Sequence, residues 1–156
     1  MESHDTYCNA NESAGLTDTQ IRTGWVLITA RQNGTPLFFS RPMGSTRQNY
    51  WGENLCGIRG NNEFFHPEVI AVNKFRQAMN GEKESIEISE DGQVLVVNRG
   101  NKGAAIVNIS DKANPLALPT GLADGEYHDE VYGCLFVVKN GVLYGTLAAD
   151  RTYIIH

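Results

Sequence analysis

Residues 84–110, which decide the fold, read ESIEISEDGQVLVVNRGNKGAAIVNIS. The first part alternates isoleucine with polar residues, and this period of two is typical of a strand with one buried face. Asp91 and Gly92 then form a strong hairpin-turn signal. Two apolar runs follow at 94–97 and 104–109. The stretch therefore predicts consecutive antiparallel strands joined by tight turns.

The same pattern continues to the end of the sequence. Asn140 and Gly141 form a second hairpin signal, and short strand-like runs recur about every ten residues. These runs are 135–138, 142–147 and 152–155. Several short strands separated by turns predict an antiparallel β-sandwich over residues 83–156.

Residues 1–82 follow a helix–strand–helix pattern instead. Thr17 and Gln20 have the spacing of a capping box, and apolar residues at helical spacing predict an amphipathic helix over 18–31. Pro67 suits the first position of a second helix, predicted over 67–79. The alternation of these elements is typical of a β/α fold.

The run 35–40, TPLFFS, is apolar without alternation, which predicts a strand buried on both faces of a parallel sheet. Such a strand needs neighbours on both edges, so we expect residues 1–82 to be part of a larger β/α-barrel. The predicted fold class is α+β: a partial barrel segment followed by an antiparallel sandwich. Residues 42–66 form a long connection that contains Tyr50 and Trp51, and such connections are usually functional or disordered.

Composition excludes several classes of function. The 156 residues carry 13 Lys and Arg against 18 Asp and Glu, a net charge of −5, so a nucleic-acid partner is not expected. No apolar run is long enough to span a membrane, and the polar start does not resemble a signal peptide. Cys8, Cys56 and Cys134 are widely spaced, so we expect isolated thiols and no metal site.

Several blocks together resemble bacterial α-amylases of the Bacillus subtilis type, in the same order along the whole chain. They are ESHDTY at 2–7, GW at 24–25, TPLFFSRP at 35–42, AVNKF at 71–75 and NRGNKG at 98–103. The resemblance implies that residues 1–82 end the family's catalytic barrel, from the tip of its seventh strand. It also implies that residues 83–156 are the sandwich called domain C.

The resemblance implies a role for two residues at the start of the chain. Asp5 corresponds to the family's third acidic residue, which stabilises the distorted sugar in the transition state. His4 corresponds to a residue that hydrogen-bonds the same sugar. Ser3 stands where chloride-dependent members have Asn, so chloride activation is not expected. Tyr50 and Trp51 either stack on sugar rings or anchor their loop; the sequence leaves both alternatives open.

The implied enzyme cleaves internal α-1,4-glucosidic bonds of starch-like glucans with retention. Such a hydrolase needs a nucleophile and a proton donor about 5–5.5 Å apart. In the family both precede the region that this chain resembles, so we expect the chain alone to lack two of three catalytic carboxylates. The calcium of full-length relatives is likewise expected outside it, and those relatives are typically secreted. The expected partners are an α-glucan and either the remaining barrel or a second copy of the chain.

Two other classes of function stay open at this point. The chain could be a non-catalytic glucan-binding module in which loop aromatics hold the sugar. It could also be a structural or interaction module whose sandwich stabilises a barrel. Hydrolysis of starch by the chain alone would exclude both, and a glucan titration would separate them from each other.

Overall fold

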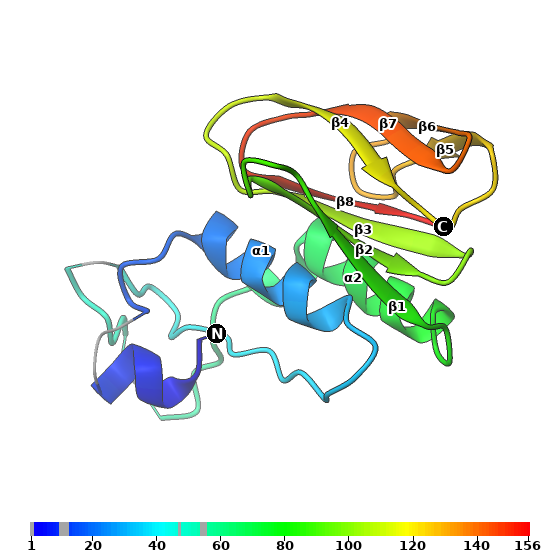
Figure 1. The fold of residues 1–156 in the computed structure, drawn as a ribbon. Coiled ribbons are helices and arrows are strands. Elements are labelled where there is room, and N and C mark those ends of the chain that lie inside the picture. The colour runs from blue at the N-terminus through cyan, green and yellow to red at the C-terminus, as the bar shows by residue number, and fades with distance from the viewer. Residues whose placement is uncertain (1, 10–12, 47, 54–55) are drawn as a thin grey trace.

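The computed structural model describes residues 2–9, 13–46, 48–53 and 56–156. These residues form a helical layer and two four-stranded antiparallel sheets (Figure 1). The helical elements are η1 (Asp5–Asn9), α1 (Asp18–Thr29), η2 (Glu63–Phe65) and α2 (Pro67–Ala78). The strands are β1 (Glu84–Ile88), β2 (Val94–Arg99), β3 (Gly103–Asn108), β4 (Asn114–Pro119), β5 (Gly125–His128), β6 (Leu135–Lys139), β7 (Val142–Leu147) and β8 (Arg151–Ile155).

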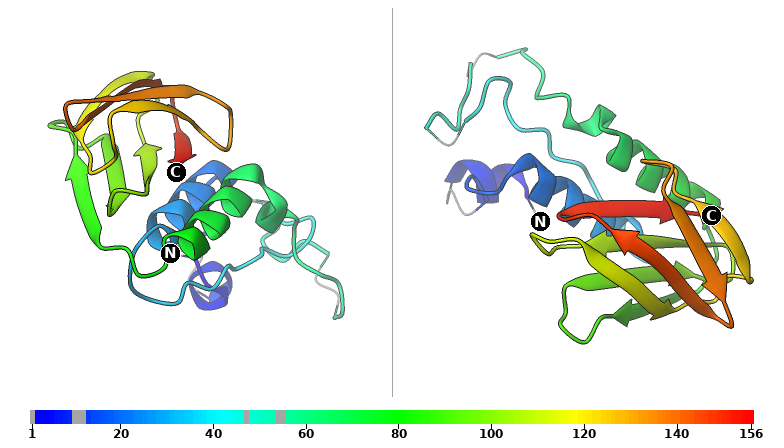
Figure 2. Two further views of the ribbon diagram at one scale, coloured as in Figure 1. Left: turned by 90° about the vertical axis from the view of Figure 1, so that its right-hand side faces the viewer. Right: turned by 90° about the horizontal axis from the view of Figure 1, so that it is seen from above.

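The layers stack in the order helices, first sheet, second sheet. The first sheet has the strand order β1-β2-β3-β8 and the second β4-β7-β6-β5. Figures 1 and 2 show α1 and α2 side by side on one face of the first sheet, while the second sheet covers its other face. The predicted α+β class and antiparallel sandwich are confirmed. The boundary of the two predicted domains at residue 82 stays a prediction.

The central strands of the first sheet are buried on both faces, which explains their continuous apolar runs. On the face toward the helices, Val97, Val107 and Ile154 pack with α1 and α2. On the opposite face, Val96 and Ile106 pack with the second sheet. Because successive side chains of a strand point to opposite faces, each central strand contributes to both apolar cores. The helices therefore share a core with the first sheet.

Both helices begin at the predicted residues. The Thr17 hydroxyl accepts a hydrogen bond from the Gln20 amide, and the Gln20 side chain accepts one from the Thr17 amide, which completes the predicted capping box. Helix α2 has Pro67 in its first turn, and His66 Nδ1 accepts from the Glu68 amide. These local hydrogen bonds satisfy amides that have no partner inside the helix.

The predicted strand at 35–40 is wrong. The described residues give this segment no ladder, and one isolated bridge between Pro42 and Gly60 follows it. Phe38 packs edge-on against Trp25, with 5.0 Å between the ring centroids, but Leu37 is 82% exposed. An extended segment becomes a strand only when a neighbouring backbone pairs with it, and the described residues supply no such neighbour here.

Cys56 and Cys134 are free cysteines, as expected for isolated thiols, and the side chain of Cys8 lies outside the described residues. Among the described residues, no helix combines the length and apolar character that crossing a bilayer requires.

Gly145 on β7 faces a fully buried aromatic ring, and we expect Gly145→Ala to destabilise the sandwich. A Cβ at this position would lie 2.4 Å from Cδ1 of Phe136. That ring packs against Tyr153 with 5.4 Å between ring centroids, so it has little room to move. We expect the free energy of unfolding to fall by about 1–3 kcal/mol in urea titrations.

The matched control for this substitution is Thr146→Ala, on the same strand but exposed. It should change the free energy of unfolding by less than about 0.5 kcal/mol. Equal effects of the two substitutions would contradict the packing that the structure gives to Gly145.

Candidate functional site

The candidate site is a tight turn at residues 2–7. The Ser3 amide donates to Oγ1 of Thr6 at 2.9 Å, and the Thr6 amide donates back to Oγ of Ser3 at 3.3 Å. The Tyr7 amide donates to the Ser3 carbonyl at 3.0 Å. These reciprocal bonds close the turn in the manner of a capping box. They account for a serine at position 3 by local geometry alone.

His4 and Asp5 lie at the tip of this turn and face solvent. Their side chains are 78% and 68% exposed, and His4 Nε2 lies 3.3 Å from Asp5 Oδ1. Asp5 begins the π-helix η1, so the expectation that these residues end a strand is wrong. Ser3 and Thr6 make the hydrogen bonds inside the turn, and the side chains of His4 and Asp5 point outward.

Glu2 and Arg41 anchor one end of the turn through a buried ion pair. Arg41 Nε donates to Oε2 of Glu2 at 2.9 Å, and Nη2 donates to Oε1 at 2.8 Å. The Glu2 side chain is 2% exposed and that of Arg41 11%. Burial alone lowers the pKa of Arg41, but hydrogen bonds and attraction from Glu2 outweigh burial and raise it. Arg41 is therefore charged at neutral pH.

Tyr7 anchors the other end of the turn to the long connection. Its ring is fully buried, and its hydroxyl donates to the Tyr50 carbonyl at 2.8 Å. The rings of Tyr7 and Tyr50 meet edge-on, with 6.3 Å between their centroids. Trp51 follows and is 49% exposed. The structure thus brings Tyr50 to the turn that carries His4 and Asp5, and leaves half of the Trp51 surface open.

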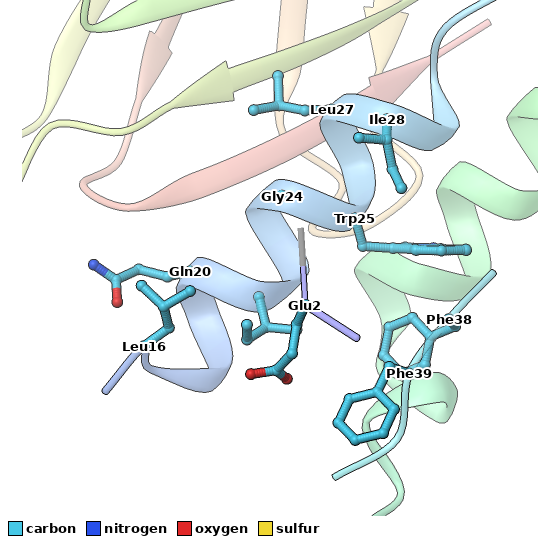
Figure 3. A pocket seen from close by; sticks show the side chains of 10 residues that line it. Glu2, Leu16, Gln20, Gly24, Trp25, Leu27, Ile28, Phe38 and Phe39 are labelled. Atoms are coloured by element: carbon cyan, nitrogen blue, oxygen red, sulfur yellow. The ribbon is translucent and has the colours of Figure 1, made fainter. Parts of the chain in front are cut away.

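An apolar cavity lies beside the Glu2 end of the turn. It has a volume of about 280 Å³ between helix α1 and the extended segment 35–40. Figure 3 shows Trp25, Phe38 and Phe39 on one side of it and Leu16 on the other. Its lining offers few polar groups, so it suits an apolar partner better than a sugar.

Sequence reasoning missed the two anchors. Glu2 and Arg41 are separated by 39 positions, and no local pattern predicts that they pair. Tyr7 and Tyr50 are 43 positions apart, and no local pattern predicts their contact either. Residue type gives the only sequence signal, since charged residues are rarely buried without a partner.

A calcium site is not supported by the described residues. They hold no group of three or more His, Cys, Asp or Glu side chains arranged to bind a metal ion. Calcium is held by six to eight oxygen ligands, which require such a cluster.

Comparison with known proteins identifies the relatives of the chain. It is 40% identical over 164 residues to the α-amylase of Butyrivibrio fibrisolvens, covering 99% of this chain and 17% of the relative. It is 36% identical over 158 residues to the α-amylase of Clostridium acetobutylicum, covering the whole chain and 19% of the relative. The chain thus spans less than a fifth of the length of these relatives. No family model matches it.

Solved structures share the fold at lower identity. Wild-type α-amylase I of Eisenia fetida superimposes with a TM-score of 0.70 at 17% identity, over 99% of this chain and 40% of that one. An E249Q variant of the same enzyme, solved with maltohexaose, gives 0.63 at 19% identity, over 86% of this chain and 34% of that one. These likenesses establish the fold.

The fold and the sequence similarity along the whole chain both point to the α-amylases. More particularly, the chain is related over its entire length to the α-amylases, and its match to a small part of each is consistent with their C-terminal part. The resemblance drawn from the sequence blocks is confirmed.

Proposed function

We propose that this chain forms the C-terminal part of an α-amylase that cleaves internal α-1,4-glucosidic bonds of starch-like glucans with retention. The observation that carries the proposal is the turn at 2–7. Buried anchors hold both of its ends, while His4 and Asp5 point to solvent. This exposed His-Asp pair lies on a fixed turn, and 36–40% identity to α-amylases supplies a chemical role for it.

In this proposal Asp5 is the carboxylate that stabilises the transition state. Positive charge develops on the sugar ring as the glycosidic bond breaks, and a fixed carboxylate beside it lowers the barrier. His4 hydrogen-bonds the hydroxyls of the same sugar. The half-exposed ring of Trp51 offers an apolar face on which a neighbouring sugar stacks, and Tyr50 lies at the same edge through its link to Tyr7.

The same proposal assigns residues 1–82 to the catalytic barrel and 83–156 to the sandwich that supports it. The rest of the barrel would pack on the apolar cavity and on Leu37, which is 82% exposed. A strand added beside 35–40 would pair with its backbone and cover both features. The remaining barrel is thus a better partner for this surface than a glucan.

The nucleophile and the proton donor would come from that remaining part. Glu2 is the acidic side chain nearest in sequence to Asp5 among the described residues, and its carboxylate is fully engaged with Arg41. A buried carboxylate in a bidentate ion pair is unavailable as a nucleophile. We therefore expect the isolated chain to release no reducing sugar from starch.

A chimera tests the proposal. The segment of the Butyrivibrio fibrisolvens α-amylase that matches this chain is replaced by residues 1–156. We expect the chimera to hydrolyse soluble starch, and Asp5→Asn to lower its kcat by about 10²–10³-fold, because the substitution removes a charge that acts in the transition state. Reducing-sugar release is the measurement, and cooperative thermal melting shows that each variant is folded.

The matched control is Asp91→Asn, an exposed aspartate in the turn between β1 and β2 whose carboxylate accepts from Ser89 and Gln93. It should leave kcat unchanged. A folded chimera that keeps more than half of its activity with Asp5→Asn would exclude the assigned role. A folded but inactive chimera that binds glucan saturably would support a non-catalytic module instead.

A further inference from the structure

The Glu2–Arg41 pair costs more to build than an ordinary surface ion pair. Both partners are almost fully buried, and the guanidinium contacts both carboxylate oxygens at 2.8–3.2 Å. A buried pair gains little net stability over apolar side chains of similar volume, because both ions lose their hydration. What a bidentate pair provides is fixed geometry. The fixed geometry of the Glu2–Arg41 pair therefore holds the segments that carry these two residues in place.

Arg41 contacts the segment around Asp5 on both sides. It pairs with Glu2, three positions before Asp5, and its guanidinium carbon lies 5.1 Å from the ring centroid of Tyr7, two positions after it. Nη2 also donates to the Ser13 carbonyl at 3.0 Å. One side chain, placed by the end of the extended segment 35–40, thus joins three points of the first 13 residues.

The turn between these contacts leaves Asp5 little freedom in its backbone. Ser3 and Thr6 close it with reciprocal hydrogen bonds, and the Tyr7 hydroxyl ties its far side to the Tyr50 carbonyl. Without such ties the segment could not hold a site in a fixed geometry. The contacts that hold the Asp5 backbone are thus made by its neighbours, while the Asp5 side chain itself faces solvent.

We propose that Glu2 and Arg41 are positioning residues for Asp5, an inference that rests on the function proposed above. The pair fixes the place of the Asp5 carboxylate relative to the sugar without touching substrate itself. A misplacement of about 1 Å at a reacting centre costs roughly 10²-fold in rate. Loss of the pair therefore acts on kcat rather than on general substrate binding.

Arg41→Met in the chimera tests this inference. We expect kcat to fall by about 10²-fold while KM changes by less than about threefold, because binding by the other sugar contacts is kept. Arg41→Lys should recover only part of the loss, since an ammonium cannot make the bidentate pair. The matched control is Arg31→Met, which removes another Arg–Glu pair, with Glu84 at 2.8 Å, and should leave kcat unchanged.

A second measurement uses the 156-residue chain without any activity. Hydrogen exchange at the Tyr7 amide, which donates to the Ser3 carbonyl, reports on the closed turn. Arg41→Met should raise this exchange rate about tenfold or more, and Arg31→Met should not. If Arg41→Met prevents folding, Glu2→Gln replaces it: the amide keeps the shape of the side chain but cannot accept both guanidinium hydrogen bonds, and kcat should fall about 3- to 10-fold.

The outcomes separate the two proposals. Activity that persists with Asp5→Asn overturns the proposed function. Activity that is lost with Asp5→Asn but unchanged with a folded Arg41→Met, or with Glu2→Gln where that variant takes its place, overturns the positioning role alone. Unchanged exchange at the Tyr7 amide in a folded Arg41→Met chain also overturns it. A fall in kcat at steady KM, with faster exchange at Tyr7, supports it.

Discussion

Arg99→Met is expected to lower the free energy of unfolding by about 3–4 kcal/mol. Arg99 is 2% exposed and lies at the end of β2, where its guanidinium reaches the ends of both helices. Nη1 donates to the carbonyl of Ala30, the C-cap of α1, at 3.0 Å. Nη2 donates to the carbonyl of Met79, the C-cap of α2, at 2.9 Å.

The size of this effect follows from what the substitution leaves behind. The last carbonyls of a helix have no partner inside it, and a cation at that end also interacts favourably with the helix dipole. Arg99 serves two such ends and additionally donates to the Glu82 carbonyl at 3.1 Å. Burial lowers the pKa of Arg99, yet a guanidinium keeps its charge in proteins. Methionine fills a similar volume but leaves buried carbonyls unsatisfied, at about 1–3 kcal/mol each.

Urea unfolding followed by circular dichroism measures this loss. Lys102→Met is the control, because Lys102 forms an exposed pair with Glu82 at 2.7 Å and its side chain is 60% exposed. That change should cost less than about 1 kcal/mol. Arg99→Lys should fall between the two, since one ammonium cannot serve both helix ends. A loss below 1 kcal/mol for Arg99→Met would show that the helices hold to the sheet without this side chain.

The second large effect is expected for Glu68→Ala, which should lower the free energy of unfolding by about 3–5 kcal/mol. Glu68 is in the first turn of α2 and is 3% exposed. Its carboxylate accepts from Arg22 Nε of α1 at 3.0 Å, from the Tyr132 hydroxyl at 3.0 Å and from the Thr152 hydroxyl of β8 at 2.8 Å. A single buried carboxylate thus joins both helices to the sandwich.

The partners of Glu68 depend on its charge. Burial and the neighbouring Glu68 carboxylate raise the pKa of Tyr132, so its hydroxyl stays protonated and donates. Burial alone lowers the pKa of Arg22, but hydrogen bonds and attraction from Glu63 and Glu68 raise it above its ordinary value. Removal of the carboxylate leaves a partly buried cation and buried donors without this acceptor, which is the costly way to break such a network.

Glu130→Ala is the matched control, since Glu130 pairs with His156 at 2.9 Å with both side chains partly exposed. Its loss should cost less than about 1 kcal/mol. Glu68→Gln should cost less than Glu68→Ala because the amide oxygen still accepts hydrogen bonds. If Glu68→Ala and Glu130→Ala shift the urea midpoint equally, the network does not join the layers as the contacts indicate.

The elements that the sequence predicted correctly are those fixed by local chemistry. The capping box at Thr17 and Gln20, the proline at the start of α2 and the turn at Asp91 and Gly92 each act within a few residues. The strand β1 forms as predicted, but its burial does not alternate as expected, since Ile88 is 57% exposed. The block NRGNKG at 98–103 has a structural role. Asn98 forms hydrogen bonds with Thr120 and the Pro119 carbonyl, and Arg99 donates to the carbonyls at the ends of both helices.

The failed prediction at 35–40 has a complementary cause. Its apolar run describes a segment fit for a sheet, but strand formation depends on a neighbour that no local pattern specifies. The doubly buried strands proved to be β2 and β3, in an antiparallel sheet covered by helices on one face and by a second sheet on the other. A continuous apolar run therefore reports two buried faces and leaves the direction of the neighbouring strands open.

The sequence by itself determined where helices and turns begin, that an antiparallel sandwich follows them, and which family the chain resembles. Only the tertiary structure decided that Glu2 meets Arg41, that Tyr7 meets Tyr50, and that Glu68 and Arg99 join the helices to the sheet. The physical reason is range: capping, turn formation and side-chain alternation act between neighbours along the chain. The Glu2–Arg41 and Glu68–Thr152 contacts join residues 39 and 84 positions apart, and such buried pairs exist only once packing has removed their water.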